Sequence, residues 1–563
     1  MATSKPRIFG LNLVIAGLLS QAHIVTAETL PSQPLLNTVS SQFVEDAVQQ
    51  QKAEMWVNEI AGDISVIRYI NKLAQIYRDI GYTPLWQDTR AADEFERQLR
   101  VLSHANVSSD FSSRYSLLKH FKLSNDWRQY DLLATDTLLA YMSYVETVPE
   151  FGRGWFFGAG VDPDLPLPSE MQQSLLNSAI ETDRLNFFVA ALKPVDERYN
   201  QITEAIAQLE QTAASQYWPG FYQSGIIRYG ARLANPERLI TILENLGDLP
   251  SYQADQLRVD QVKKYNVELV EAVKSFQERH GLKVDGVIGP KTRYWLSTAP
   301  KERIRVLALN AQRMRLWPAE HPSLLVVNIP DFGMSLWLDN EHVLNSKVIV
   351  GRPSRRTPLM TSSISSVVFN PYWNVPISIM RKDILPKAQY DRGYLYRNDF
   401  RVIRSWTSNE QIPIHTIDWR IVNSKSFPYR LRQKPGNKNA LGKFKFNIPN
   451  DNSIYLHDTP TKSLFNKETR AFSSGCVRVE HADELAMILL NHSGVSEDRV
   501  NQLKARANTK TVGLSNRVKV HVIYQTAWVD GQGEVHFRDD IYRYDQFGRM
   551  SQKEEKLTNN FNE

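Results

Sequence analysis

The chain has 563 residues, which at about 150 residues per domain gives room for three or four domains. Hydrophobic residues make up 42% of the chain and charged residues 23%, proportions that exclude extensive disorder. The net charge of +6 arises from 67 basic and 61 acidic residues spread along the chain without a basic run, so the sequence does not indicate a nucleic-acid partner.

The N-terminus has the pattern of a secretory signal peptide. Lys5 and Arg7 precede an apolar stretch over about 8–19, and the small residues at 25–27 suit a signal peptidase. We therefore expect residues 1–27 to be removed. The apolar stretch falls short of the ~18 to 20 residues that a membrane span needs, so no stable span is expected after cleavage.

Over residues 28–235 the sequence predicts a leader followed by a helical scaffold domain. The leader, about 28–40, is polar and contains proline. From about Val44 onward, apolar residues recur at steps of three and four, which is the pattern of helices that bury one face. A loop rich in glycine, proline and aromatic residues is expected over 152–168. These apolar stripes indicate a packed core and suggest no chemistry.

A compact module is expected over 236–298. A helical stretch is followed by turns at Asp285 and Gly289, and Pro290 suits the first position of the next helix, where its missing amide hydrogen is harmless. This spacing resembles the three-helix peptidoglycan-binding module, with an ordinary helical hairpin as the alternative. A basic, amphipathic connector is predicted over 299–322.

From Leu324 the spacing of apolar residues changes to two, which indicates β-strands. We expect a mostly-β domain over 323–545 and a polar tail over 546–563. The segment 377–438 is rich in Arg, Lys, Tyr and Pro and interrupts the strands. Because long inserted segments in compact domains are usually lids or binding loops, we expect it to cap a site. The fold class predicted for the whole chain is multidomain α+β.

Cys476 is the single cysteine of the chain, so no intrachain disulfide can form. Ser473, Ser474 and Gly475 precede it and Arg478 follows, which places the sulfur on a small, polar turn beside a cation. Such surroundings favour a reactive thiolate. Gly475 also leaves room for a substrate and permits a strained turn. The alternative is a small, buried hydrophobic side chain.

His457 lies upstream of Cys476, at the end of an alternating run that begins at Ser453. The alternation places Tyr455 and His457 on one face of a strand. A histidine at a strand end is often simply solvated. A cysteine nucleophile needs a nearby base to form its thiolate, however, and the pairing therefore favours His457 as the base of Cys476.

At YLHDTP and SSGCVR the sequence resembles the L,D-transpeptidase family of bacterial cell-wall enzymes. The family signature is a histidine, a spacer, and then Ser/Thr-His-Gly-Cys. Ser474 stands where many members have a second histidine, and Arg478 stands where many have asparagine. With TAWVDGQGEVHFRDDIY further on, the chain is similar to the large subgroup that has a helical scaffold region and a peptidoglycan-binding module.

The resemblance implies roles for individual residues. Cys476 is the nucleophile and His457 is its base, oriented by the main-chain carbonyl of Asp458. Amide hydrogens around Gly475 and Cys476 stabilise the oxyanion. The residues implied in substrate binding are Trp373, Tyr455, Ser474 and Arg478. The plainer alternatives are a surface ion pair for the arginine, a half-buried strand position for the tyrosine and a core position for the tryptophan.

The resemblance also implies a periplasmic enzyme that forms 3→3 cross-links. The thiolate attacks the carbonyl at the L-centre of a diamino acid in a stem peptide, D-Ala leaves, and an amine of a second stem resolves the thioester. Peptidoglycan stems and glycan are the expected partners, and other enzymes of cell-wall synthesis are candidate partners. The sequence has no phosphate loop or zinc-ligand spacing, so neither a cofactor nor a metal is implied.

Three alternatives stay open. Water in place of the amine makes the same site a carboxypeptidase, or an enzyme that releases lipoprotein from the wall. A cysteine endopeptidase whose histidine follows the cysteine would use His536 or His521 as its base. A wall-binding scaffold would use the helical region and the module without catalysis.

Overall fold

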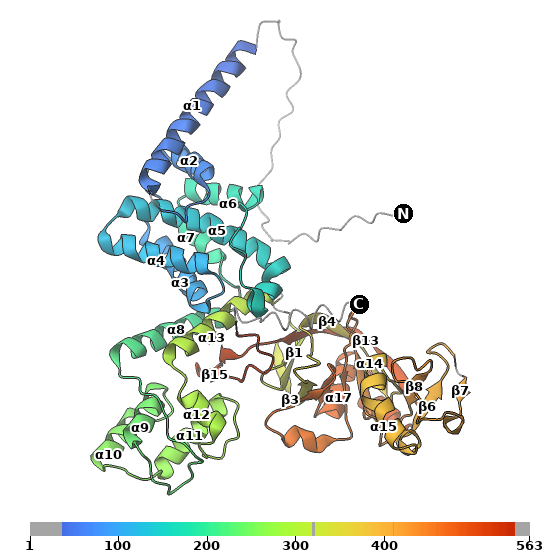
Figure 1. Ribbon diagram of the computed structural model, residues 1–563. Helices are drawn as coiled ribbons and strands as arrows, with labels where there is room; N and C mark the ends of the chain where they lie inside the picture. Colours follow the sequence, from blue (N-terminus) through green and yellow to red (C-terminus); the bar gives the residue numbers. More distant parts are fainter. Residues whose placement is uncertain (1–35, 63, 318–320, 409, 547–563) are drawn as a thin grey trace.

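The computed structural model describes residues 36–62, 64–317, 321–408 and 410–546, with side chains from residue 45 onward. Figure 1 shows a helical region at the top, a smaller helical module at the lower left and a β-rich domain at the lower right. The predicted signal peptide and residues 547–563 of the predicted tail lie outside the described residues. Within the described part, no helix has the length and hydropathy of a membrane span.

The helical region buries an apolar core that includes Leu99, Leu138 and Tyr141. Its helices are α1 (Leu36–Ala61), α2 (Ile70–Asp79), α3 (Thr89–Ala105), α4 (Ser109–Ser124), α5 (Trp127–Gly154), α6 (Glu170–Glu181), α7 (Leu185–Ala191) and α8 (Arg198–Ser215). Side chains cap some of these helices, as where the Ser108 hydroxyl accepts the Phe111 amide hydrogen at the start of α4. The region is therefore a helical bundle, as its apolar spacing predicts.

The segment expected as a connector forms helix α13 (Pro300–Arg313), which is part of the helical core. Its amphipathic face packs against α3 and α8, and Leu307 and Ala311 are fully buried. The sequence pattern gave the amphipathic helix but not its burial, because both α3 and α8 are distant in sequence. The stretch 299–322 thus joins the scaffold to the β-rich domain through a packed helix.

The module contains α9 (Pro236–Asn245), α10 (Ser251–Val259), α11 (Val267–Arg279) and α12 (Pro290–Leu296). Helix α10, which follows Pro250, is additional to the three expected helices. The module also extends upstream of its expected start, because Ile227 bridges to Ile288 and Arg232 bridges to Lys264. These bridges join distant positions, so local patterns could not reveal them.

The β-rich domain is built on one large sheet with the strand order β11-β3-β12-β10-β9-β4-β13-β1-β2. Because β2 also pairs with β3, the strands close on themselves. The strands are β1 (Leu324–Asn328), β2 (Gly333–Leu338), β3 (Glu341–Gly351), β4 (Met360–Phe369), β9 (Phe444–Asn447), β10 (Leu456–His457), β11 (Ala471–Ser473), β12 (Val477–Val479) and β13 (Lys510–Ile523). Leu456, Phe446 and Val477 point to its core, which α17 (Ala482–His492) and α18 (Glu497–Ala505) complete.

The expected capping insertion is a folded subdomain with a sheet and a core of its own. Its sheet has the order β5-β8-β6-β7. The strands are β5 (Trp373–Asn374), β6 (Phe400–Ile403), β7 (Gln411–Ile412) and β8 (Arg430–Gln433), and the helices are α14 (Ile377–Ile379), α15 (Leu385–Tyr390) and α16 (Tyr394–Arg397). A separate apolar cluster, which includes Met380, Leu395 and Leu431, holds it together. We call 373–433 the cap, which begins at β5 because β5 pairs with β8.

A hairpin near the end of the chain connects the module to the other two regions. It consists of β14 (Ala527–Val529) and β15 (Val535–Phe537). The side chain of Arg279 in the module donates to the Val535 carbonyl at 2.8 Å, and the Trp295 indole donates to Asp539 at 3.0 Å. The ring of Phe537 packs against Trp295. The module is therefore docked on the β-rich domain.

Candidate active site

The pairing of β10 with β12 brings the predicted catalytic residues to one face of the sheet. These strands are parallel and in register, with Leu456 opposite Val477 and His457 opposite Arg478. Side chains alternate along a strand, so Tyr455 and Cys476 share the face of His457 and Arg478. The rings of Tyr455 and His457 lie 5.7 Å apart. Residues that are distant in sequence thus form one surface.

This surface is the floor of a cleft of about 580 Å³ that lies between the sheet and the cap. The predicted site residues that line it are Trp373, Tyr455, His457, Ser474, Cys476 and Arg478. Asp458 and Gly475 do not line it but hold the residues that do. Trp373 comes from β5 of the cap, whereas the other lining residues in this set come from the sheet domain.

Asp458 fixes the orientation and the tautomer of His457. The Nδ1 atom of His457 lies 2.5 Å from the main-chain oxygen of Asp458. Because a carbonyl oxygen only accepts hydrogen bonds, Nδ1 carries the proton and Nε2 is left with a free lone pair. Burial, together with the positive charges of Arg478 and Lys445, lowers the pKa of His457 to about 3. His457 is therefore a neutral base.

Burial favours a neutral thiol at Cys476, and the expectation of a resting thiolate is wrong. Burial is the largest influence and raises the pKa of Cys476 above its ordinary value. Hydrogen bonds from Tyr455 and the charges of Lys445 and Arg478 lower it, but by less. Since His457 is also neutral, there is no imidazolium to stabilise a thiolate, and the proton must move when a substrate is attacked.

The turn before Cys476 has a backbone conformation that favours glycine. Gly475 has a φ of +119°, and a Cβ there would lie 3.3 Å from Ile454. Its N–H donates to the Ser473 hydroxyl at 3.1 Å, and that hydroxyl donates to the Cys476 carbonyl at 2.5 Å. The Gly475 amide is therefore engaged within the turn, which leaves the Cys476 N–H as the main-chain donor for an oxyanion.

Ser474 connects the nucleophile turn to the cap. Its hydroxyl oxygen accepts from Arg355 at 2.9 Å and from Arg352 at 3.4 Å. Both arginines lie in the loop after β3 and form ion pairs with Asp383, which belongs to the turn Met380–Ile384 of the cap. At the position where many family members have a second histidine, this chain therefore has a hydroxyl that takes part in a polar bridge to the cap.

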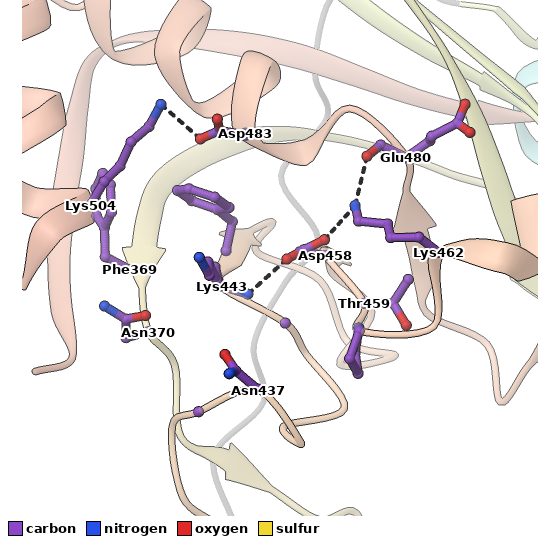
Figure 2. Close-up of a pocket in the computed structure, with 14 residues that line it drawn as sticks. Phe369, Asn370, Asn437, Lys443, Asp458, Thr459, Lys462, Glu480, Asp483 and Lys504 are labelled. Atoms are coloured by element: carbon purple, nitrogen blue, oxygen red, sulfur yellow. Dashed lines mark hydrogen bonds and ion pairs between the residues drawn. The ribbon is translucent and has the colours of Figure 1, made fainter. Parts of the chain in front are cut away.

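A second pocket, of about 500 Å³, is lined in part by Asp458, Thr459 and Pro460 of the segment that follows His457. Figure 2 shows its lining, in which the Asp458 carboxylate accepts from the Lys443 main-chain N–H at 2.8 Å and pairs with the Lys462 ammonium at 2.6 Å. The Lys462 ammonium also donates to the Glu480 carbonyl at 2.7 Å. These contacts immobilise Asp458, and through its carbonyl they immobilise His457.

Lys445 is a site residue that sequence reasoning missed. It lies on β9 directly opposite His457, and its ammonium is 4.3 Å from the centre of the Tyr455 ring. A lysine between Phe444 and Phe446 was a usable signal, because a charged side chain inside an apolar strand faces either solvent or a functional site. Which of these it faces depends on the pairing of β9 with β10, and the sequence does not show that pairing.

The histidines of the endopeptidase alternative do not reach the cleft. His536 lies on β15, where it pairs with Asp530 at 2.7 Å and stacks on Trp528. His521 lies on β13 and lines a small crevice with Phe157, away from Cys476. In the structure, neither lines the cleft that contains Cys476, so the endopeptidase alternative lacks a base.

Known proteins match the chain along most of its length. Residues 322–507 match the L,D-transpeptidase catalytic domain, residues 71–206 match a scaffold domain, and residues 237–296 match a “Putative peptidoglycan binding domain”. A relative from Haemophilus influenzae, described as “Putative L,D-transpeptidase”, is 28% identical over 539 residues, which are 96% of this chain and 89% of that protein. Residues 322–507 form an L,D-transpeptidase catalytic domain.

The match to the catalytic domain includes the whole cap and every predicted site residue. Two solved L,D-transpeptidases are similar at low identity. One, from Mycobacterium smegmatis, is 12% identical with a TM-score of 0.17 and covers 36% of this chain and 58% of that chain. The other, from Stackebrandtia nassauensis, is 15% identical with a TM-score of 0.19 and covers 55% and 97%. At these scores the likeness does not extend to the positions of individual residues.

Proposed function

We propose that this L,D-transpeptidase forms 3→3 cross-links between peptidoglycan stem peptides in the periplasm, through a thioester on Cys476 and with release of D-Ala. Removal of residues 1–27 as a signal peptide is part of the proposal. The observation that carries it is the arrangement in the covered cleft: His457, with Nδ1 held by Asp458 and Nε2 unprotonated, shares one sheet face with the Cys476 thiol.

In the first half of the reaction, Nε2 of His457 accepts the thiol proton as Sγ of Cys476 attacks the carbonyl carbon at the L-centre of the donor stem. The Cys476 N–H donates to the oxyanion that forms. The bond to the D-Ala nitrogen then breaks, and that nitrogen takes the proton from the imidazolium. The products are free D-Ala and a thioester.

In the second half, the amine of the acceptor stem attacks the thioester carbonyl and gives a proton to Nε2. The bond from carbon to Sγ breaks, and the departing sulfur recovers that proton. The enzyme returns to its starting state and the two stems are joined by an amide. The guanidinium of Arg478 lines the cleft, and its buried Nε atom has no hydrogen-bond partner, so it is available to a stem carboxylate.

The cap supports an amine rather than water as the second substrate. Because a folded subdomain covers the floor, access of bulk water to the thioester is reduced, whereas a bound acceptor stem brings its amine into the cleft. The matched binding domain supports peptidoglycan as the polymer on which the enzyme works.

The test is incubation of the protein with purified disaccharide tetrapeptide stems, followed by mass spectrometry. We expect a dimer with the mass of two stems less one D-Ala, and no dimer with the Cys476→Ala variant. Tripeptide stems without dimer would make the protein a carboxypeptidase. If the folded protein yields neither product but binds sacculi, it is a wall-binding scaffold.

A further inference from the structure

Three strands place a row of cationic and basic side chains on the sheet face that carries the floor of the cleft. Lys445 on β9 is opposite His457 on β10, and His457 is opposite Arg478 on β12. Neighbouring strands lie about 4.8 Å apart, so the histidine has one cation on each side. The row continues with Val368 on one side and Ile349 on the other, which are both apolar. The two cations therefore flank the catalytic histidine directly.

Neither cation has an acidic partner within the described residues. The ammonium of Lys445 contacts the Tyr455 ring, and no carboxylate lies within ion-pair distance of it in the described chain. The Nε atom of Arg478 is buried without a hydrogen-bond partner. Two unneutralised positive charges beside a reactive thiol are costly to bury. Negative charge that develops on the sulfur during the reaction would offset the free-energy cost of burying these two positive charges.

We propose that Lys445 is a positioning residue that acts through its charge on the proton exchange between Cys476 and His457. The role rests on the Cys476 chemistry proposed above. When the thiol proton moves to Nε2, the sulfur becomes negative and Lys445 stabilises it. The same charge opposes the imidazolium, so His457 is driven to give the proton to the departing nitrogen. Lys445 does not line the cleft, so it acts on the reacting groups and not on the substrate.

The other charged and titratable groups near this row line the cleft and come from several elements. They are Tyr455 and His457 at β10, Cys476 and Arg478 from the β12 side, Arg352 from the loop after β3, Asp383, Lys387 and Tyr394 from the cap, and Lys438 from the segment that follows it. The one carboxylate in this set, Asp383, is paired with Arg352 and Arg355. It therefore does not cancel the charge of Lys445.

The decisive experiment measures alkylation of Cys476 by iodoacetamide against pH, because this readout does not depend on the transpeptidase reaction. Lys445→Met keeps the apolar stem beneath Tyr455 and removes the charge, so we expect the thiol pKa to rise by about one unit and alkylation at pH 8 to slow by about tenfold. Lys445→Arg should restore both. Lys347→Met, at an exposed position on β3, is the matched control and should change neither.

With stem substrates, Lys445→Met should lower kcat while leaving KM unchanged, and Lys445→Arg should recover kcat. Thermal unfolding of each variant checks that it is folded. An unchanged thiol pKa in folded Lys445→Met would overturn the proposal, as would equal impairment of Lys445→Arg and Lys445→Met, which would indicate a purely steric role. If stems do not react even with the parent, the alkylation result still decides the role of Lys445.

Discussion

The floor and the roof of the cleft are built differently. The floor residues lie on or next to β10 and β12, whose main-chain pairing with each other and with β9 sets the position of each side chain. The roof is the cap, whose apolar cluster shares no member with that of the sheet. A polar bridge, from Asp383 to Arg352 and Arg355, joins the two near Ser474. Partly exposed ion pairs contribute only about 0 to 1 kcal/mol each.

The difference separates two functions. To move a floor residue, the protein must break paired strands and a buried core, so the chemistry is fixed by folding. The polar bridge between roof and floor consists of partly exposed ion pairs, which can break while the fold stays intact, so access to the cleft can change. Floor substitutions should therefore affect the chemical step, and roof substitutions should affect the entry of substrate and water.

The largest effect is expected from removing the nucleophile. A carbapenem presents a strained carbonyl to Cys476, and by the family resemblance it should form one covalent adduct. Intact-protein mass spectrometry should show that adduct on the parent and none on Cys476→Ser. An equal adduct on the variant would place the nucleophile elsewhere on the protein.

Removal of the base should be the next largest effect. His457→Ala takes away the acceptor of the thiol proton, and loss of a general base typically slows a reaction by roughly 10²- to 10⁴-fold. The rate of β-lactam acylation measures it. His521→Ala and His536→Ala are matched controls outside the cleft and should stay within about twofold of the parent. If His521→Ala or His536→Ala slowed acylation more than His457→Ala, the endopeptidase alternative would be restored.

A smaller effect is expected at the roof. Asp383→Asn weakens the bridge to Arg352 and Arg355, and a loss of up to about 1 kcal/mol corresponds to about fivefold more opening of the cap. Hydrogen exchange should quicken across 373–433, and the ratio of hydrolysed to cross-linked product should rise. Asp391→Asn, which removes a pair with Arg397 on the surface of the cap, is the control. Equal results for both variants would mean that Asp383 does not hold the cap.

Weaker docking of the module should leave the chemical step almost unchanged. Lys291 pairs with Glu468 at 2.8 Å and with Asp539 at 3.4 Å, and its side chain is about half exposed. Lys291→Ala should change turnover of a small soluble stem by less than about twofold, because the floor is untouched. Turnover on intact sacculi should fall more. A larger loss with the soluble stem would show that docking supports the floor.

The smallest change is expected between pH 8 and pH 5. Because the pKa of His457 is about 3, below the ordinary value of about 6.5, the fraction protonated at pH 5 is only about 1%. Burial raises the pKa of Cys476, so the thiol also stays protonated through this range. The kcat/KM value should therefore be nearly constant. An acid limb near pH 6.5 would show that His457 is less buried during turnover.

Local patterns were sufficient for the parts of the site that lie within short segments. The alternation before His457 predicted its shared face with Tyr455, and the small residues before Cys476 predicted the turn that Gly475 allows. The apolar spacing predicted the helical region, and the spacing around Pro290 predicted the start of α12. The fold class is confirmed as multidomain α+β, with a helical module and a mostly-β catalytic domain.

The features that were missed depend on contacts between distant residues. The role of Lys445 follows from the register of β9 with β10, and the burial of α13 follows from α3 and α8. The thiolate expectation failed because desolvation depends on everything that covers Cys476, including the cap, whereas the sequence shows only its neighbours along the chain. The polar surroundings that suggested a low pKa are present, but burial outweighs them.

The hairpin that docks the module also fixes the distance between the module and the catalytic cleft. Contacts of Arg279, Trp295 and Lys291 hold the module against the β-rich domain, so the two are not joined by a flexible linker alone. If the module binds glycan, each stem reaches Cys476 at a constant distance from the glycan-binding site. The enzyme would then select glycan strands by the distance between the bound glycan and the stem. Strands that place a stem at that distance from the module are cross-linked, and strands with another spacing are not.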